Sequence, residues 1–200
     1  MAIKCIVGLG NPGDDYLDTR HNIGFKFINS MTKISDSDVS KKVTLKSQIF
    51  ELFIGGSKYI CIKPQTFMNL SGQAVRSVMN FYKLELDEIC VVTDDLDIPF
   101  GTVRVRKKGG AGTHNGMKSV IQELGSQNFM RLRLGIGPKP EYLDSKDFVL
   151  QRFSKQELDV LPETLSKIRD LYIKHINDPV DTLMNRMNGI QFNDIQSVNQ

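Results

Sequence analysis

The sequence predicts one α/β/α domain with a central, mixed and mostly parallel twisted sheet. At 200 residues, of which 40% are hydrophobic, the chain is long enough to bury one sizeable core. Apolar strand-like runs alternate with segments of helical period along it. It has no internal repeat and no linker long enough to divide it. We therefore expect residues 1–200 to form a single domain, with about 188–200 as a disordered tail.

The expected elements follow one another along the chain. Residues 3–9 are apolar throughout, as in a strand buried in a parallel sheet. Further strand-like runs cover 48–54, 58–62, 89–93, 102–106 and 132–136. Helical spacing begins near 23 and recurs over 71–82, 117–124 and 154–187. Residues 55–57 predict a hairpin turn and 35–42 a loop. Ser71 is a candidate helix cap, and Pro162 and Pro179 are expected to interrupt the last helical segment or to start turns in it.

The lack of a targeting-signal pattern and the placement of the cysteines both favour a cytoplasmic protein. The first residues run directly into an apolar strand and lack the pattern of a signal peptide. No apolar run approaches the length that spans a bilayer. Cys5, Cys61 and Cys90 lie in separate apolar strand-like stretches without metal-ligand spacing. We expect them to be buried, reduced thiols.

The positive charge is concentrated in one part of the chain. The formal net charge is +3, yet residues 101–140 contain eight basic residues and one acidic residue, or +7, which leaves −4 elsewhere. A one-sided basic segment favours a polyanion such as nucleic acid over an ordinary solvated surface. The candidate phosphate contacts are Arg104, Arg106, Lys107, Lys108 and Arg133.

Two of the three histidines lie in similar polar clusters. Arg20-His21-Asn22-Ile23-Gly24 and Thr113-His114-Asn115-Gly116 each place a His-Asn pair beside glycine and just before a helix-like stretch. Histidine exchanges a proton near neutral pH, and asparagine both donates and accepts hydrogen bonds. The alternative interpretation is two helix caps that contain histidine. Asn11, Asn69 and Asp94 also fall where predicted strands run out, so these segments are expected to converge on one crevice.

Two other motifs suggest ligands less strongly. Gly8-Leu9-Gly10-Asn11-Pro12-Gly13 matches the dinucleotide fingerprint, but Pro12 and the acidic residues after it predict a loop where that fingerprint needs a helix. Asp94, Asp95 and Asp97 suggest Mg²⁺, which prefers carboxylates. Without a P-loop or a second acidic motif, one acidic turn is weak evidence for a metal. We expect neither a metal nor a cofactor.

Taken together, the motifs resemble the bacterial-type peptidyl-tRNA hydrolases over nearly the whole chain. The resemblance is carried by the residues of 6–13, 16–24, 63–72, 94–99, 109–116 and 131–137, with Phe148-Val149-Leu150 behind them. Thr113 departs from the glycine that is usual in this family. If the turn requires a positive φ, a β-branched residue would strain it. From about Leu158 onward the chain matches in pattern only.

The resemblance implies hydrolysis of the ester between peptide and tRNA by a monomeric enzyme that recycles tRNA during translation. On its own chemistry, His21 is the candidate base for water, and Asp94 would hold the imidazole in the correct tautomer or cap a loop. No serine or cysteine lies in a nucleophile-elbow context, which favours direct attack by water.

The resemblance also implies the substrate-binding residues. It assigns discrimination of N-blocked from free aminoacyl esters to Asn11, and contacts with the tRNA substrate to Tyr16, Phe67, Asn69 and Asn115. Aromatic faces suit base stacking, although Phe67 would also suit a core. Met68 is either a wall of the cleft or core. His114 is expected to orient the cleft, with Asp97 as its possible partner, or to cap a helix.

Two functions from other classes stay open on sequence alone. A catalytically silent RNA-binding module would use the same basic segment. A metal-dependent phosphohydrolase would be built on the three aspartates. Hydrolysis of N-acetylated aminoacyl-tRNA in excess chelator separates all three possibilities.

Overall fold

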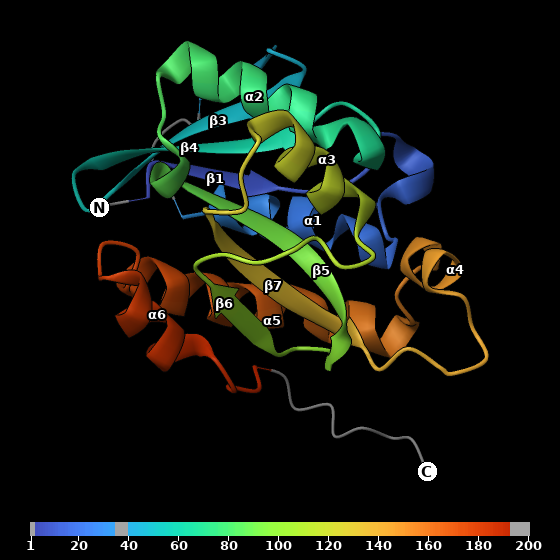
Figure 1. The fold of residues 1–200 in the computed structure, drawn as a ribbon. Helices are drawn as coiled ribbons and strands as arrows, with labels where there is room; N and C mark the ends of the chain where they lie inside the picture. Colours follow the sequence, from blue (N-terminus) through green and yellow to red (C-terminus); the bar gives the residue numbers. More distant parts are fainter. Residues whose placement is uncertain (1–2, 35–39, 193–200) are drawn as a thin grey trace.

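The computed structural model describes residues 3–34 and 40–192 of the chain. Seven strands and six α-helices alternate in it (Figure 1). The strands are β1 (Cys5–Gly8), β2 (Ser40–Thr44), β3 (Ser47–Ile54), β4 (Ser57–Pro64), β5 (Ile89–Pro99), β6 (Val103–Arg106) and β7 (Met130–Gly137). The helices are α1 (Ile23–Met31), α2 (Ser71–Tyr82), α3 (Asn115–Leu124), α4 (Ser145–Leu150), α5 (Lys155–Lys174) and α6 (Val180–Met187).

All seven of these strands form one sheet in the order β2-β3-β4-β1-β5-β7-β6. The central strands β4, β1, β5 and β7 pair in parallel, while β2–β3, β3–β4 and β6–β7 pair antiparallel. The β3–β4 hairpin turns at Gly55-Gly56, as predicted. The predicted mixed sheet is therefore confirmed, with its parallel part in the middle and antiparallel strands at both edges.

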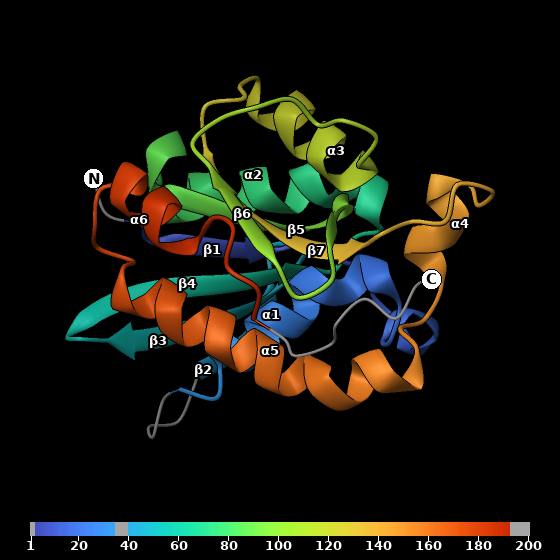
Figure 2. The same cartoon turned by 90° about the horizontal axis from the view of Figure 1, so that it is seen from below.

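Helices cover the two faces of the sheet to different extents. α1 and α5 lie on one face and α2 and α3 on the other, which gives the predicted three layers (Figure 2). The alternation along β5 shows why two cores form: Cys90 and Val92 pack toward α1 and α5, while Ile89 and Val91 pack toward α2 and α3. On the α2–α3 side, β6 and β7 extend beyond the helices (Figure 1).

Several expected boundaries are wrong. β2 replaces the end of the predicted loop, since strand pairing with β3 begins at Ser40; residues 35–39 of that loop lie outside the described residues. β5 continues through the acidic residues to Pro99, with a register shift against β7 after Asp95. α4 was not predicted. Ser71 is the first helical residue rather than the cap, and Pro162 lies inside α5 without ending it.

The glycines after β1 pack tightly rather than starting a helix. A β-carbon at Gly8 would lie 2.3 Å from the carbonyl oxygen of Gly24, so strand β1 and helix α1 approach at a distance that only glycine permits. The segment that follows forms a 3₁₀ turn, Asp14–Tyr16. The glycines that match the dinucleotide fingerprint are therefore explained by the close packing of β1 against α1. The segment after them is a turn and not the helix that such a fingerprint needs, as predicted.

The last described residues cover the free edge of the sheet. Asn188 accepts the backbone N–H of Val105 through its side-chain oxygen at 2.6 Å, and the backbone N–H of Phe192 donates to Gly101 at 2.8 Å. Residues 188–192 therefore pack along β6 instead of beginning a disordered tail, while 193–200 lie outside the described residues. Cys5, Cys61 and Cys90 are buried free thiols, as expected. Among the described helices, none combines the length and the apolar character that a membrane span requires.

Candidate active site

A cleft of about 470 Å³ opens at the carboxyl ends of the parallel strands. Segments far apart in sequence line it, as predicted: the turn after β1, the start of α1, the turn before α2, the end of β5 and the start of α3. Nine of the expected site residues meet there, namely Asn11, His21, Phe67, Met68, Asn69, Asp94, His114, Asn115 and Arg133. Tyr16, Arg104, Arg106, Lys107 and Lys108 lie outside the lining.

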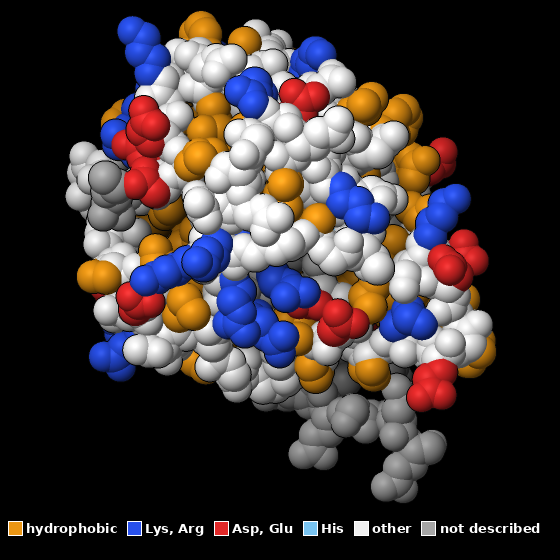
Figure 3. Space-filling view, viewed as in Figure 1, with side chains coloured by type: hydrophobic (Ala, Val, Ile, Leu, Met, Phe, Trp, Pro, Cys, Tyr) orange, Lys and Arg blue, Asp and Glu red, His pale blue; other side chains and the backbone are white. Residues whose placement is uncertain are grey.

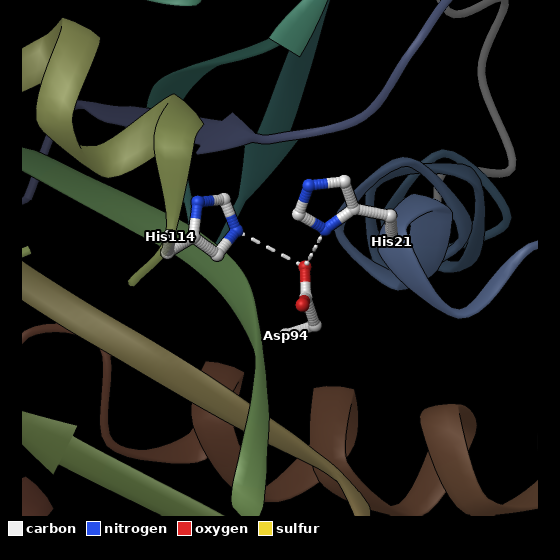
Figure 4. A group of neighbouring side chains, drawn as sticks. All are labelled: His21, Asp94 and His114. Atoms are coloured by element: carbon white, nitrogen blue, oxygen red, sulfur yellow. Dashed lines mark hydrogen bonds and ion pairs between the residues drawn. The ribbon is translucent and has the colours of Figure 1, made fainter. Parts of the chain in front are cut away.

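Two histidines share one carboxylate oxygen in this cleft. His21 comes from the 3₁₀ turn Arg20–Asn22, Asp94 from β5, and His114 from the N-cap of α3 (Figure 4). His21 Nδ1 lies 2.8 Å from Asp94 Oδ1, and His114 Nε2 lies 3.0 Å from the same atom. The second ring nitrogen of His21 points away from Asp94 (Figure 4). His21 therefore has one nitrogen held by a carboxylate and the other available to a ligand.

The cap of α3 determines which nitrogen of His114 carries the proton. The backbone N–H of Met117 donates to His114 Nδ1 at 3.2 Å, so this nitrogen is an acceptor. In the neutral imidazole the proton then lies on Nε2 and points at Asp94. His114 is therefore both a helix cap and a donor to Asp94. The prediction that Asp97 is the partner of His114 is wrong, because Nδ1 accepts the Met117 N–H and Nε2 binds Asp94.

Burial and charge act in opposite directions on the His21–Asp94 pair. Burial alone would lower the pKa of His21, but the negative charge of Asp94 and its hydrogen bond outweigh burial and raise the pKa. Burial alone would raise the pKa of Asp94, but the two histidines hold it well below its usual range. Asp94 therefore stays ionised, and His21 becomes a stronger base than a free imidazole.

Asn11 is held in place by its backbone and one side-chain atom. Its backbone N–H and C=O bind the side chain of Asn22 at 2.8 and 2.9 Å, and its Oδ1 accepts the backbone N–H of Met68 at 2.8 Å. These contacts leave the Nδ2 donor of Asn11 facing a cleft that Asn69 and Asn115 also line. Met68 itself is buried in the core beneath the cleft, so it serves as both core and wall.

An aromatic pair lies at one side of the cleft. Phe67 lines it with 56% of its surface exposed, which rules out a core role. The Tyr16 ring meets it edge to face, with ring centroids 6.4 Å apart. The exposed Phe67 ring, two residues before the exposed Asn69, therefore offers stacking surface near a hydrogen-bonding amide.

The three aspartates of β5 do not converge as a metal site requires. Asp94 faces the histidines, while Asp95 forms an ion pair with Arg133 at 2.8 Å and accepts the backbone N–H of Asp97 at 3.0 Å. His21, Asp94 and His114 do bring three potential ligand atoms within 4.8 Å of one another. However, the proton on His114 Nε2 occupies the lone pair that a cation would need. As arranged, this group shares protons rather than coordinating a metal.

The basic residues gather on the face of the sheet that α2 and α3 leave uncovered (Figure 3). Arg104 on β6 pairs directly with Arg133 on β7, which lines the cleft, so this surface continues the cleft outward. Lys107 and Lys108 follow β6 and are exposed, with Lys107 in an ion pair with Asp181 at 2.5 Å. Arg131, by contrast, is 2% exposed and stacks on Phe129, so its role is structural.

Thr113 causes no backbone strain. The left-handed residue of this turn is Gly112, with φ of 57°, and Thr113 has no positive φ. Sequence reasoning predicted no site role for the apolar residues Leu96, Val149 and Leu150, which also line the cleft. The Asp144 cap before α4 was its only local signal, and six residues show too little periodicity to reveal a helix.

Comparison with known proteins shows which family this chain belongs to. The model of the family described as peptidyl-tRNA hydrolase matches residues 5–195. The peptidyl-tRNA hydrolases of Finegoldia magna and Alkaliphilus oremlandii are 47% and 48% identical over 184 residues, which cover 92% of this chain and 96% and 98% of theirs. A solved peptidyl-tRNA hydrolase from Acinetobacter baumannii superposes with a TM-score of 0.82 at 29% identity, covering 96% of this chain and 97% of that one. The chain belongs to the peptidyl-tRNA hydrolase family.

Proposed function

We propose that this protein hydrolyses the ester bond of peptidyl-tRNA and releases free tRNA and an N-blocked peptide. The observation that carries the proposal is the His21–Asp94 pair, 2.8 Å apart in a polar cleft of a chain from this family. Ester hydrolysis requires a base for water, stabilisation of the oxyanion and a grip on both sides of the bond. The cleft supplies a candidate for each.

His21 acts as the general base. Its Nδ1–H donates to Asp94, which leaves the Nε2 lone pair to take a proton from water as that water attacks the ester carbonyl carbon. The tetrahedral oxyanion then collapses, and the bond to the ribose oxygen breaks. His21 returns the proton to that oxygen, so the enzyme ends in its starting state. Asp94 orients the imidazole and stabilises its protonated form without taking the proton itself.

The asparagines bind the reacting part of the substrate. Asn11 offers Nδ2 to the peptide main chain next to His21, and its other side-chain atom is fixed by Met68. Asn69 and Asn115 face the same cleft, where their amides can donate to carbonyl groups, including the developing oxyanion. A donor that is already positioned before the reaction requires little reorganisation during it.

The tRNA occupies the outer surface. Tyr16 and Phe67 offer ring faces to the terminal nucleotide. Arg133, Arg104 and Arg106 lead from the cleft along β7 and β6 toward Lys107 and Lys108, and their charges suit backbone phosphates. Contacts of this kind position the substrate without reading its sequence, which suits an enzyme that accepts many tRNAs.

The proposed enzyme works as a cytoplasmic monomer without metal or cofactor. The buried reduced thiols suit a reducing compartment, and the tautomer of His114 disfavours a cation between the histidines. Translation is where peptidyl-tRNA arises, so recycling its tRNA belongs to the same compartment.

Hydrolysis of N-acetylated aminoacyl-tRNA in excess chelator tests the proposal. We expect release of free tRNA by the wild-type protein at the same rate with and without chelator. Activity that disappears with chelator and returns with Mg²⁺ would favour the metal-dependent alternative. Binding of the tRNA without turnover would show a silent RNA-binding module.

A further inference from the structure

A largely buried ion pair is made by the residue that precedes the proposed base, and neither of its side chains lines the cleft. The two Nη atoms of Arg20 bind the two carboxylate oxygens of Glu157 at 2.6 and 2.8 Å. The side chains are only 11% and 16% exposed. A buried pair of this kind gains little net stability, because removing two charges from water offsets their attraction. Stability alone therefore gives a weak reason for this arrangement.

The pair joins the turn that carries His21 to the first turn of α5, and neighbouring contacts join the same turn to the end of α4 and the link between the two helices. The guanidinium of Arg20 lies 4.8 Å from the ring of Phe148 and 5.1 Å from that of Phe153, so the two aromatic rings fix its plane. The backbone N–H of Arg20 donates to Gln151 at 3.0 Å, and the backbone N–H of Phe153 donates to Asp18 at 3.0 Å. The side-chain and main-chain contacts hold the same two segments together.

Glu157 is fixed just as firmly at its own end. It forms a capping box with Ser154 at the start of α5, accepting the backbone N–H of Ser154 at 2.7 Å. Burial alone would raise the pKa of Glu157, but the hydrogen bonds from Arg20 and Ser154 outweigh burial and lower it. The carboxylate that holds Arg20 is therefore ionised and attached to a 20-residue helix.

The base and the α4 part of the cleft lining both connect to this junction. His21 is the next residue after Arg20 in the same 3₁₀ turn, and α4 packs against that turn. Val149 and Leu150 of α4 form the cleft wall that follows Phe148 in the chain. Misplacing a catalytic group by about 1 Å can lower a rate by about 10². A contact that fixes both the base and the α4 part of the cleft lining can therefore control the rate without touching the substrate.

We propose that Arg20 and Glu157 are positioning residues that hold His21 on Asp94 and hold α4 at the cleft. This inference rests on the proposed function. The bidentate geometry is essential to it, because a single charge on a flexible stem fixes neither the plane nor the distance. The charged and titratable groups that face His21 are Asp94 from β5 and His114 from α3, so a displaced turn weakens the contact with Asp94 first.

Arg20→Lys and Glu157→Gln test the proposal, with Arg169→Lys as the matched control. Arg169 lies on the same helix α5, is equally buried at 14% exposed, and donates to the backbone of Ser30 at 3.1 Å, away from the cleft. We expect each test variant to lower kcat by about tenfold or more. The acidic limb of its pH profile should also move to lower pH, because His21 loses part of the effect of Asp94. Arg169→Lys should keep the wild-type kcat and pH profile even if its Tm is lower than that of the wild type.

The outcomes separate this inference from the proposed function. A wild-type protein that does not hydrolyse N-acetylated aminoacyl-tRNA overturns the function itself. If the wild type is active, the two test variants decide the positioning role. The role is overturned if Arg20→Lys and Glu157→Gln have a lower Tm but the wild-type kcat and pH profile. If Glu157→Gln does not fold, Arg20→Lys together with Glu157→Asp, whose shorter side chain withdraws the carboxylate from Arg20, decides between these results. Equal effects in the test variants and in Arg169→Lys would show a general effect of loosening α5 and also overturn the role.

Discussion

Charge acts differently in the cleft and at the basic edge of the sheet, which we define as Arg104, Arg106, Lys107 and Lys108 on and after β6. His21 and Asp94 are 7% and 6% exposed and are hydrogen-bonded to each other, so Asp94 raises the pKa of His21 and His21 lowers the pKa of Asp94. Lys107 and Lys108 are exposed, and the only ion pair that the described residues give this pair of lysines joins Lys107 to the exposed Asp181. Buried charges are coupled and sensitive to small displacements, whereas exposed charges are screened by salt and act nearly independently. Variants of the two regions should therefore differ in kind as well as in size.

The largest effect is expected from His21→Ala. Without a base, turnover of N-acetylated aminoacyl-tRNA should fall by about 10²–10⁴. Binding of tRNA should not change, because the outer surface stays intact. Single-turnover rates and a separate binding titration measure the two quantities. A variant that keeps more than about a tenth of wild-type turnover would remove His21 from this role.

Asp94→Asn is expected to have the next largest effect. The amide keeps the size of the side chain but loses the charge, so turnover should fall on the order of 10²-fold through poorer orientation of the imidazole. His114 also loses its carboxylate partner, because the same Asp94 oxygen binds both histidines. Circular dichroism verifies the fold. Unchanged turnover would show that Asp94 only caps the loop.

Asn11→Asp should change selectivity more than rate. The substitution keeps the oxygen that accepts Met68 N–H and replaces the Nδ2 donor with a negative charge. Discrimination between N-acetylated and free aminoacyl-tRNA should fall on the order of tenfold, because a substrate group loses its donor. The ratio of the two kcat/KM values measures it. A ratio equal to that of the wild type would count against the assignment.

The smallest and most separable effect is expected at the basic edge. Lys107→Ala with Lys108→Ala should raise KM for full-length tRNA substrates and lower the log–log salt slope by about 1.4–1.8, from about 0.7–0.9 per contact. A minimal ester with only the terminal nucleotides should barely respond. Lys4→Ala with Lys58→Ala, at the amino ends of β1 and β4, is the control and should change neither quantity. An unchanged salt slope in the Lys107 and Lys108 variant would make these lysines an ordinary solvated surface.

The sequence predicted the cleft better than it predicted the contacts inside it. Residues at strand ends and in short motifs identified Asn11, His21 and Asp94, because parallel strands bring their carboxyl ends together. The pairing of His21 with Asp94, 73 residues apart, agrees with the sequence prediction. The predicted partner of His114 was wrong, because motifs do not show which carboxylate a side chain reaches in the fold. Its tautomer depends on a backbone N–H that only the folded cap brings into place.

The same distinction explains the errors in the fold. Long periodic segments such as α1 and the β3–β4 hairpin were predicted because their patterns are local. β2 pairs with the adjacent β3, but its polar sequence shows no alternation that predicts a strand. The edge segment 188–192 packs against residues far away in sequence, so its own sequence gave no signal. Pro162 is the eighth residue of α5 and removes one backbone hydrogen bond of the helix. The helix continues past it because Leu161, Leu165 and Ile168 pack in the core on either side of the proline.

The pKa of His21, measured by NMR and compared with the pH–rate profile, tests the central claim most directly. A general base must be unprotonated, so kcat/KM should fall as pH drops through its pKa. Because Asp94 raises that pKa above the ordinary 6.5, the acidic limb of the wild type should lie above this value and coincide with the NMR titration of His21. In Asp94→Asn, burial acts unopposed, and both should move together to lower pH. A limb that differs from the His21 titration, or that stays in place in Asp94→Asn, would contradict the assignment of His21 and Asp94 as base and partner.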